Sequence, residues 1–160
     1  MKLNLKRNLK SKKNIKHKVK DFRHIGITVQ NLKKLIKFFV KDLGFEIYKK
    51  MNESGNYIEN MLNLPKVKVT TVKLKAPDGN LIELLKFQNY PHNKNWNSKI
   101  YFTGPTHFAL TVKDLDTSYN YLKKKYKFNA PPQLSPDGYA KVTFFKGPEN
   151  LHIELVEVLG

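Results

Sequence analysis

The sequence predicts an α+β protein built from two copies of a β-α-β-β-β module. A ten-residue segment that starts at Arg23 recurs 83 positions later at Thr106, with His, Thr, Val and Leu at matching places. Each copy precedes a stretch with helical apolar spacing. Each half closes with a Pro-containing turn and a strand in which a glutamate interrupts apolar residues. With 160 residues and 40% hydrophobic composition, the chain is long enough to form one domain with its own core.

The first module opens with a strand whose alternate residues differ in size. His24, Gly26 and Thr28 share one face, while the bulky aliphatic residues between them take the other. A helix is expected over residues 32–40, where apolar residues recur at helical spacing, and Gly44 is well placed to end it. The remaining expected elements are a short helix over 57–64, a strand over 67–75, a turn at 77–80 and a final strand over 81–85.

The second module repeats this order. Its opening strand again presents a histidine, a small residue and a threonine on one face, here His107, Ala109 and Thr111. A helix follows from Leu115, and a closing strand follows the turn at 148–150. The expected organisation is a basic, disordered tail over 1–20 and a domain over 21–160, with module one at about 22–87, a linker at about 88–104 and module two at about 105–158.

The positive charge is concentrated at the N-terminus. The formal net charge is +17, and residues 1–20 contribute nine basic and no acidic side chains. Only two of the 30 basic residues are arginine, the side chain that specific phosphate and base recognition favours. We therefore expect no nucleic-acid function beyond weak contact by the tail. No apolar run approaches 18 residues and there is no cysteine, so we expect a cytoplasmic protein without membrane contact, disulfides or thiol chemistry.

Two histidines and two glutamates occupy equivalent positions in the modules. His24 and His107 lie on the small-residue faces of the opening strands, and Glu83 and Glu154 point away from the apolar residues that flank them. An ionised glutamate inside an apolar strand needs a cation or another strong partner. Each of these residues alone is compatible with an ordinary structural role. Their matched placement favours one divalent-metal site, because imidazole and carboxylate suit Zn, Ni, Co, Mn or Fe(II).

Four segments within residues 22–158, HIGITVQNL, APDGNLIELL, GPTHFALTVKDLD and GPENLHIELVEV, resemble the vicinal oxygen chelate superfamily. This group includes glyoxalase I, methylmalonyl-CoA epimerase, fosfomycin-resistance proteins and extradiol dioxygenases. The resemblance implies that the paired modules form a curved, cup-like mixed sheet around a metal. It implies four ligands, one from the first and one from the last strand of each module: His24, Glu83, His107 and Glu154.

The complete His-Glu-His-Glu set is most similar to that of glyoxalase I. The resemblance implies a metal-dependent lyase or isomerase (lactoylglutathione lyase-like) that converts an α-hydroxycarbonyl or hemithioacetal through a metal-bound enediolate. Glu154 is then the expected proton-transfer base and Glu83 its counterpart. A ring-cleaving dioxygenase and a non-catalytic, resistance-type ligand-binding protein are the alternatives.

The resemblance also implies the partners of this chemistry. Ni, Co or Zn is the expected metal, with Mn or Fe(II) as alternatives, and glutathione is a candidate cosubstrate. A homodimer is expected, and the site forms either within one chain or across the dimer. The candidates for contact with a small-molecule substrate, or for support of the ligands, are His152, Arg23, Thr28 and Thr111.

Overall fold

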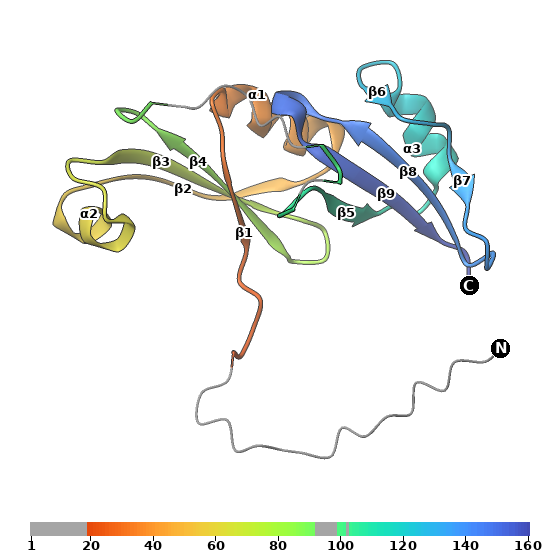
Figure 1. The fold of residues 1–160 in the computed structure, drawn as a ribbon, viewed down its shortest axis with the longest axis horizontal. Coiled ribbons are helices and arrows are strands. Elements are labelled where there is room, and N and C mark those ends of the chain that lie inside the picture. The colour runs from red at the N-terminus through yellow and green to blue at the C-terminus, as the bar shows by residue number, and fades with distance from the viewer. Residues whose placement is uncertain (1–18, 92–98, 102) are drawn as a thin grey trace, which may run out of the picture.

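The computed structural model describes residues 19–91, 99–101 and 103–160 and arranges them around two mixed β-sheets (Figure 1). In each sheet the first strand of the module pairs in parallel with the last, and the other pairs are antiparallel. The predicted α+β class with two β-α-β-β-β modules is confirmed. The expected tail lies outside the described residues except for Val19 and Lys20, and residues 92–98 of the expected linker also lie outside them.

The first sheet has the strand order β1-β4-β3-β2 and the second has the order β5-β9-β8-β6, with β7 also pairing with β8. The strands of the first sheet are β1 (Ile25–Thr28), β2 (Glu46–Ser54), β3 (Lys68–Lys75) and β4 (Leu81–Phe87). Those of the second are β5 (Phe108–Thr111), β6 (Lys127–Phe128), β7 (Gln133–Leu134), β8 (Ala140–Lys146) and β9 (His152–Val158).

The second sheet differs from the first at its outer edge. Where the first module has the nine-residue strand β2, the second has two strands of two residues each, β6 and β7. Pro131 and Pro132 lie between them and have no backbone N–H to donate to a neighbouring strand. The pair of prolines therefore divides this edge strand in two.

In the described part of the chain, three helices accompany the strands: α1 (Leu32–Lys37), α2 (Asn56–Leu62) and α3 (Leu115–Leu122). A π-helical turn, η1 (Phe38–Asp42), extends α1, and a 3-10 turn, η2 (Pro148–Asn150), precedes β9. The helical segment that begins with α1 stops before Gly44, which has a φ of +75° and can adopt this left-handed conformation without strain. The expected helix is thus present, although the apolar spacing gave no sign of the wider π turn.

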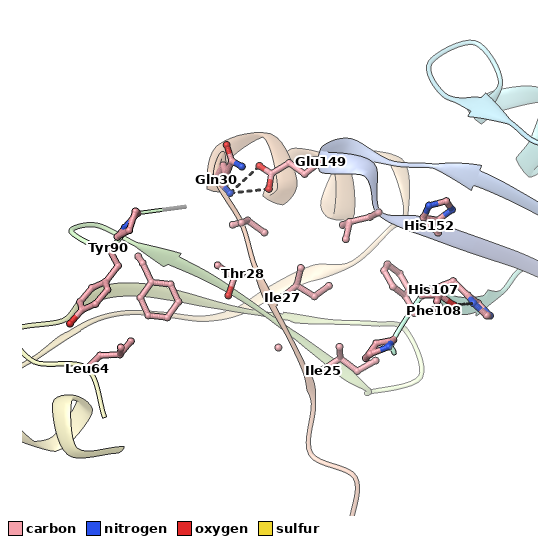
Figure 2. A pocket seen from close by; sticks show the side chains of 17 residues that line it. Ile25, Ile27, Thr28, Gln30, Leu64, Tyr90, His107, Phe108, Glu149 and His152 are labelled. Atoms are coloured by element: carbon pink, nitrogen blue, oxygen red, sulfur yellow. Dashed lines mark hydrogen bonds between the residues drawn. The ribbon is translucent and has the colours of Figure 1, made fainter. Parts of the chain in front are cut away.

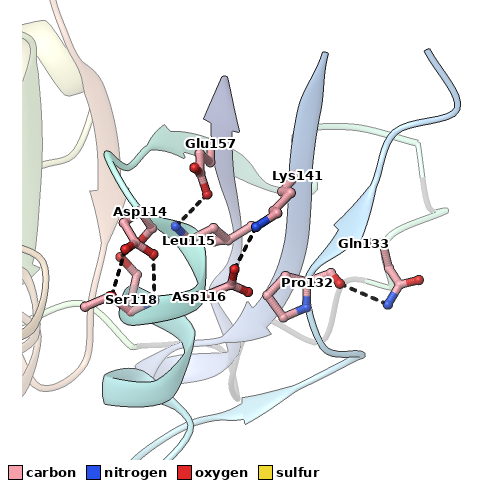
Figure 3. A network of polar contacts seen from close by, with 9 residues as sticks. Asp114, Leu115, Asp116, Ser118, Pro132, Gln133, Lys141 and Glu157 are labelled. Atoms are coloured by element: carbon pink, nitrogen blue, oxygen red, sulfur yellow. Dashed lines mark hydrogen bonds and ion pairs between the residues drawn. The ribbon is translucent and has the colours of Figure 1, made fainter. Parts of the chain in front are cut away.

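Side-chain caps attach α3 to the second sheet (Figure 3). Asp114 accepts a hydrogen bond from the backbone N–H of Thr117 at 2.8 Å, which caps the first turn. The carboxylate of Glu157, on β9, accepts a hydrogen bond from the backbone N–H of Leu115 at 2.9 Å. Lys141 of β8 pairs with Asp116 at 2.7 Å. The helix is therefore held at its N-terminus by both central strands of its sheet.

One hydrophobic core joins the two modules. Phe38 and Phe39, in the segment that extends α1, are almost completely buried and contact rings of the second module. The ring centroids of Phe38 and Phe145 lie 6.2 Å apart, and those of Phe39 and Phe108 lie 6.1 Å apart. The helical segment of module one therefore packs against the sheet of module two.

A polar contact reinforces this packing. The carboxylate of Glu149, in η2, accepts a hydrogen bond from the backbone N–H of Gln30 at 2.9 Å (Figure 2) and another from the backbone N–H of Asn31 at 2.6 Å. These donors lie just before α1, where backbone N–H groups have no partner within the helix. The core and this contact together fix the position of one module against the other.

Candidate functional site

The first module brings His24 and Glu83 together. The parallel register of β1 and β4 places Gly26 opposite Glu83, so that His24 and Glu83 point to the same side of the sheet. The distance from His24 Nε2 to Glu83 Oε2 is 3.1 Å. The Glu83 side chain is only 13% exposed, so its charge is largely removed from water.

The second module repeats this arrangement with His107 and Glu154. The register of β5 and β9 places Ala109 opposite Glu154, and the distance from His107 Nε2 to Glu154 Oε2 is 3.3 Å. Both side chains are more exposed than those of the first pair. The internal repeat therefore extends from the sequence to the geometry of the two His–Glu pairs.

Each pair supplies two of the donor atoms that a metal site needs. Two donors bound at about 2.1 Å to one ion lie roughly 3.0–3.4 Å apart, and both pairs meet this spacing. The two pairs lie on different sheets, and within the described parts of the chain no three His, Asp or Glu side chains come close enough to hold a metal ion. Two imidazoles and two carboxylates suit a divalent transition metal, provided that the two pairs are brought together.

Lys73 is a third polar group at the first pair. It lies opposite Glu83 in the β3–β4 register, with its Nζ atom 3.4 Å from Glu83 Oε1 and a side chain that is 17% exposed. The equivalent position of the second module, opposite Glu154, holds Phe144, whose ring packs edge-on against His107 at 5.3 Å. The two pairs therefore have similar donors but different neighbours.

Lys73 and Phe144 were missed in the sequence, although a signal for them exists. The turns at 77–80 and 148–150 set the register of the hairpins that they close. The position opposite each glutamate could therefore have been obtained by counting back from each turn.

A cavity of about 830 Å³ lies between the edge strands β1 and β5 (Figure 2). Its lining includes Ile25, Ile27, Thr28, His107, Phe108 and His152, but neither glutamate of the pairs. His152 is 7% exposed, on the same face of β9 as Glu154. The cavity therefore adjoins the second His–Glu pair and extends towards the first strand of the other module.

The remaining candidates are not gathered at one place. Arg23 is exposed and lies outside the lining of this cavity, whereas Thr111 lines a second cavity of about 420 Å³ beside α3. Of the four candidates for substrate contact, only Thr28 and His152 line the larger cavity. Within one chain, Arg23 and Thr111 therefore do not lie at the larger cavity.

Comparison with known proteins agrees with this architecture. Residues 21–155 match the model of the Glyoxalase/Bleomycin resistance protein/Dioxygenase superfamily. The chain belongs to this superfamily. The match covers both modules, and with them both His–Glu pairs.

The individual relatives share between 21% and 27% of their residues with this chain. The uncharacterized protein YwkD of Bacillus subtilis is 27% identical over 87% of this chain and 98% of its own. A glyoxalase family protein from Bacillus cereus has the same fold, with a TM-score of 0.81 and 23% identity over 91% of this chain and 99% of its own. Glyoxalase I of Leishmania major aligns with a TM-score of 0.60 and 21% identity over 87% of each chain.

The described residues contain no helix of the length and apolar character needed to cross a membrane.

Proposed function

We propose that the protein is a metal-dependent lyase or isomerase of the glyoxalase I type that acts as a homodimer. His24 and Glu83 of one protomer and His107 and Glu154 of its partner hold one divalent ion. The observation that supports this proposal is the pair of equivalent His–Glu arrangements, each with two donors and each on its own sheet. A protein site for a transition metal usually needs three or four protein ligands, so neither pair suffices alone.

The packing within one chain favours a site shared with a partner chain over a site formed by bringing the two modules of one chain together. The helical segment of module one is buried against module two, so a direct approach of the two pairs would have to open the shared core. In the described residues, no strand pairs with the outer edges of β1 and β5. Ile25, on β1, is 41% exposed. A second copy related by a two-fold axis would cover these edges and complete two equivalent sites.

The chain's own groups then perform a proton transfer. A bound divalent ion supplies Lewis-acid chemistry, which makes the hydrogen on the carbon beside a carbonyl more acidic. A Glu154 carboxylate oxygen accepts that proton and returns it to the neighbouring carbon, so the substrate is isomerised without net gain or loss of atoms. Glu83 is held by both His24 and Lys73, whereas the ion pairs of the described residues give Glu154 only His107. Glu154 is therefore the carboxylate with more freedom to move towards a substrate.

A screen of substrates and metals tests this function. The purified full chain is loaded separately with Ni, Co, Zn and Mn, its metal content is measured, and it is assayed with methylglyoxal plus glutathione, methylmalonyl-CoA and catechols. We expect one metal per site and turnover of an α-hydroxycarbonyl or hemithioacetal. Ring cleavage of catechols would instead indicate a dioxygenase. A protein that takes up no metal and gains no thermal stability from any of the four ions would be a non-catalytic binding module.

A further inference from the structure

The two halves of the proposed site differ at one matched position. Lys73 lies opposite Glu83 in the first module, and Phe144 lies opposite Glu154 in the second. The repeat thus conserves the donors between the modules but places a cation beside one carboxylate and an aromatic ring beside the other. This difference indicates what kind of molecule the completed site binds.

Lys73 points towards the proposed site rather than towards the core. Its neighbours on β3, Val72 and Leu74, are fully buried in the core, so alternation directs Lys73 to the opposite face, where it meets Glu83. Lys49 is its cross-strand partner on β2, and Lys75 follows on the same face; both are exposed. The face of module one around Glu83 is therefore positively charged, and Lys73 is its most buried cation.

The matching face of module two is less charged near its carboxylate. Phe144 is partly buried and packs against the ring of His107. Val142 of β8 and Val156 of β9 are cross-strand partners on the same face, next to the pair of Phe144 and Glu154. Lys146, the counterpart of Lys75, also lies on this face and is exposed, but in the described part of the chain no lysine lies directly opposite Glu154. This half therefore offers a ring and two valines as a surface for a hydrocarbon skeleton.

If the proposed function is correct, the formal charges of the completed site leave Lys73 without a counterion. The carboxylates of Glu83 and Glu154 balance the two charges of one divalent ion. The ammonium group of Lys73 then keeps one positive charge in a place where only 17% of its side chain is exposed. A partly buried charge without a counterion is costly, so the site favours a ligand that brings one negative charge.

The position of Lys73 indicates where that negative charge lies in the ligand. Its Nζ atom is 3.4 Å from an oxygen of the proposed metal ligand Glu83. A carboxylate held by Lys73 would therefore lie next to the ligand set, attached directly to the carbons that react. A remote carboxylate at the end of a peptide would not reach this position while its reacting carbons stayed at the ion.

We propose that the substrate is a small α-hydroxycarbonyl acid whose carboxylate is bound by Lys73 and whose hydrocarbon part packs against Phe144. Lys73 then determines specificity by distinguishing acids from neutral compounds of the same skeleton. A lysine interacts with a carboxylate as a point charge and makes a charge-assisted hydrogen bond.

The test compares two ligands in four proteins. Hydroxypyruvate and hydroxyacetone each offer a hydroxyl and a carbonyl oxygen on neighbouring carbons, but only hydroxypyruvate also carries a carboxylate, in place of the methyl group of hydroxyacetone. Their dissociation constants are measured by calorimetry with the cobalt-loaded full chain and with its Lys73→Met, Lys73→Arg and Lys75→Met variants, after the cobalt content of each protein is determined. Methionine keeps most of the length of lysine without its charge, and Lys75 provides the matched control on the same strand and face.

The expected result is a selective loss. Lys73→Met should weaken hydroxypyruvate binding about tenfold or more, leave hydroxyacetone within about twofold and retain cobalt. Lys73→Arg should recover part of the hydroxypyruvate affinity, and Lys75→Met should change the affinity for neither ligand.

Three results would overturn the proposal. Equal weakening of both ligands by Lys73→Met would mean that Lys73 only positions Glu83. A wild-type protein that holds cobalt but binds neither ligand would exclude this substrate class and leave the metal-dependent function intact. A wild-type protein that takes up no cobalt would contradict both proposals, and the metal analysis identifies this case before any ligand is added.

Discussion

Glu154 and Glu83 occupy equivalent positions in the repeat, yet their surroundings assign them different tasks. We expect Glu154→Gln to keep the fold and much of the metal affinity, because the amide retains the shape and one oxygen donor of the carboxylate. The amide cannot accept a proton at neutral pH, so turnover should fall about 10²–10⁴-fold. Steady-state turnover and metal content, measured on the same preparation, check this expectation.

Glu83→Gln is the matched control for the choice of base. It removes the charge that Lys73 and His24 contact, so we expect weaker metal binding and a smaller loss of turnover per bound metal. The reverse result, with Glu83→Gln inactive and Glu154→Gln close to wild type while both hold metal, would assign the base to Glu83. Full activity in both variants would contradict proton transfer by either glutamate.

Asp42 links stability to pH at the end of η1. Burial opposes its ionisation, but hydrogen bonds from Lys125 and Tyr126 outweigh burial and lower the pKa of Asp42 below its ordinary value. A carboxyl group with a lowered pKa stabilises the folded protein above its unfolded pKa of about 3.9, and this contribution disappears as the pH falls through the folded pKa.

Asp42→Asn should therefore be less stable than wild type at pH 7, by on the order of 1–2 kcal/mol. The difference between the two proteins should shrink as the pH falls below about 4. Urea denaturation of both proteins at pH 7, 5 and 3 measures it, with the exposed Asp21→Asn as a control that should change little. A difference that stays constant down to pH 3 would show that the charge of Asp42 is not its cause.

At the scale of elements, the turn between β8 and β9 packs directly against module one. A Cβ atom at Gly147 would lie 3.0 Å from Ile153 Cδ1 and 3.0 Å from Phe38 Cζ, and both side chains are fully buried. The φ of Gly147 is −77°, which any residue can adopt, so the cost of a side chain here arises from packing. Gly147→Ala should reduce the free energy of unfolding by about 1–3 kcal/mol.

Urea denaturation of Gly147→Ala, Phe38→Leu and the double variant tests this cause. Leucine at 38 leaves room for the added methyl group, so the double variant should be less destabilised than the sum of the single variants. Strict additivity would mean that the cost of the methyl group arises elsewhere than at Phe38.

The elements themselves were largely predictable, because they depend on local pattern. Apolar spacing predicted the helices at α1 and α3, and the turn residues at 77–80 predicted the start of β4. The π turn at Phe38–Asp42 was not predicted, since an apolar face two turns long does not distinguish four-residue from five-residue spacing. The division of the edge strand into β6 and β7 was also missed, although Pro131 and Pro132 are visible in the sequence.

The candidate site was predictable only in part. Strand alternation placed His24 with Glu83 and His107 with Glu154, and the structure brings each pair within 3.3 Å. The separation of the two pairs depends on Phe38 packing between modules, a tertiary contact with no local signature. The pairing of Lys73 with Glu83 depends on strand register, which side-chain alternation alone does not specify.

At the scale of the whole molecule, the shared core keeps the two His–Glu pairs apart in one chain, so the assembly determines whether a complete site exists. A two-fold homodimer would contain two sites, each with module one of one protomer and module two of its partner. Because each proposed site combines modules from two protomers, two variants that are inactive alone should regain activity when they form a mixed dimer.

The first variant combines His24→Ala with Glu83→Ala, and the second combines His107→Ala with Glu154→Ala. Each should be inactive alone, because every site in its homodimer lacks two ligands. In a mixed dimer one site keeps all four natural ligands and the other keeps none. Random assortment of equal amounts should then restore about a quarter of the wild-type sites.

Co-expression of the two variants with different affinity tags allows the mixed dimer to be isolated by two successive purifications. Its metal content and turnover should reach about half of those of the wild-type dimer, since one of its two sites is complete. A pair of chains that both carry the changes in module one is the control and should stay inactive. If each site instead formed within a single chain, every chain in the mixed dimer would lack two ligands, and neither metal binding nor turnover would return.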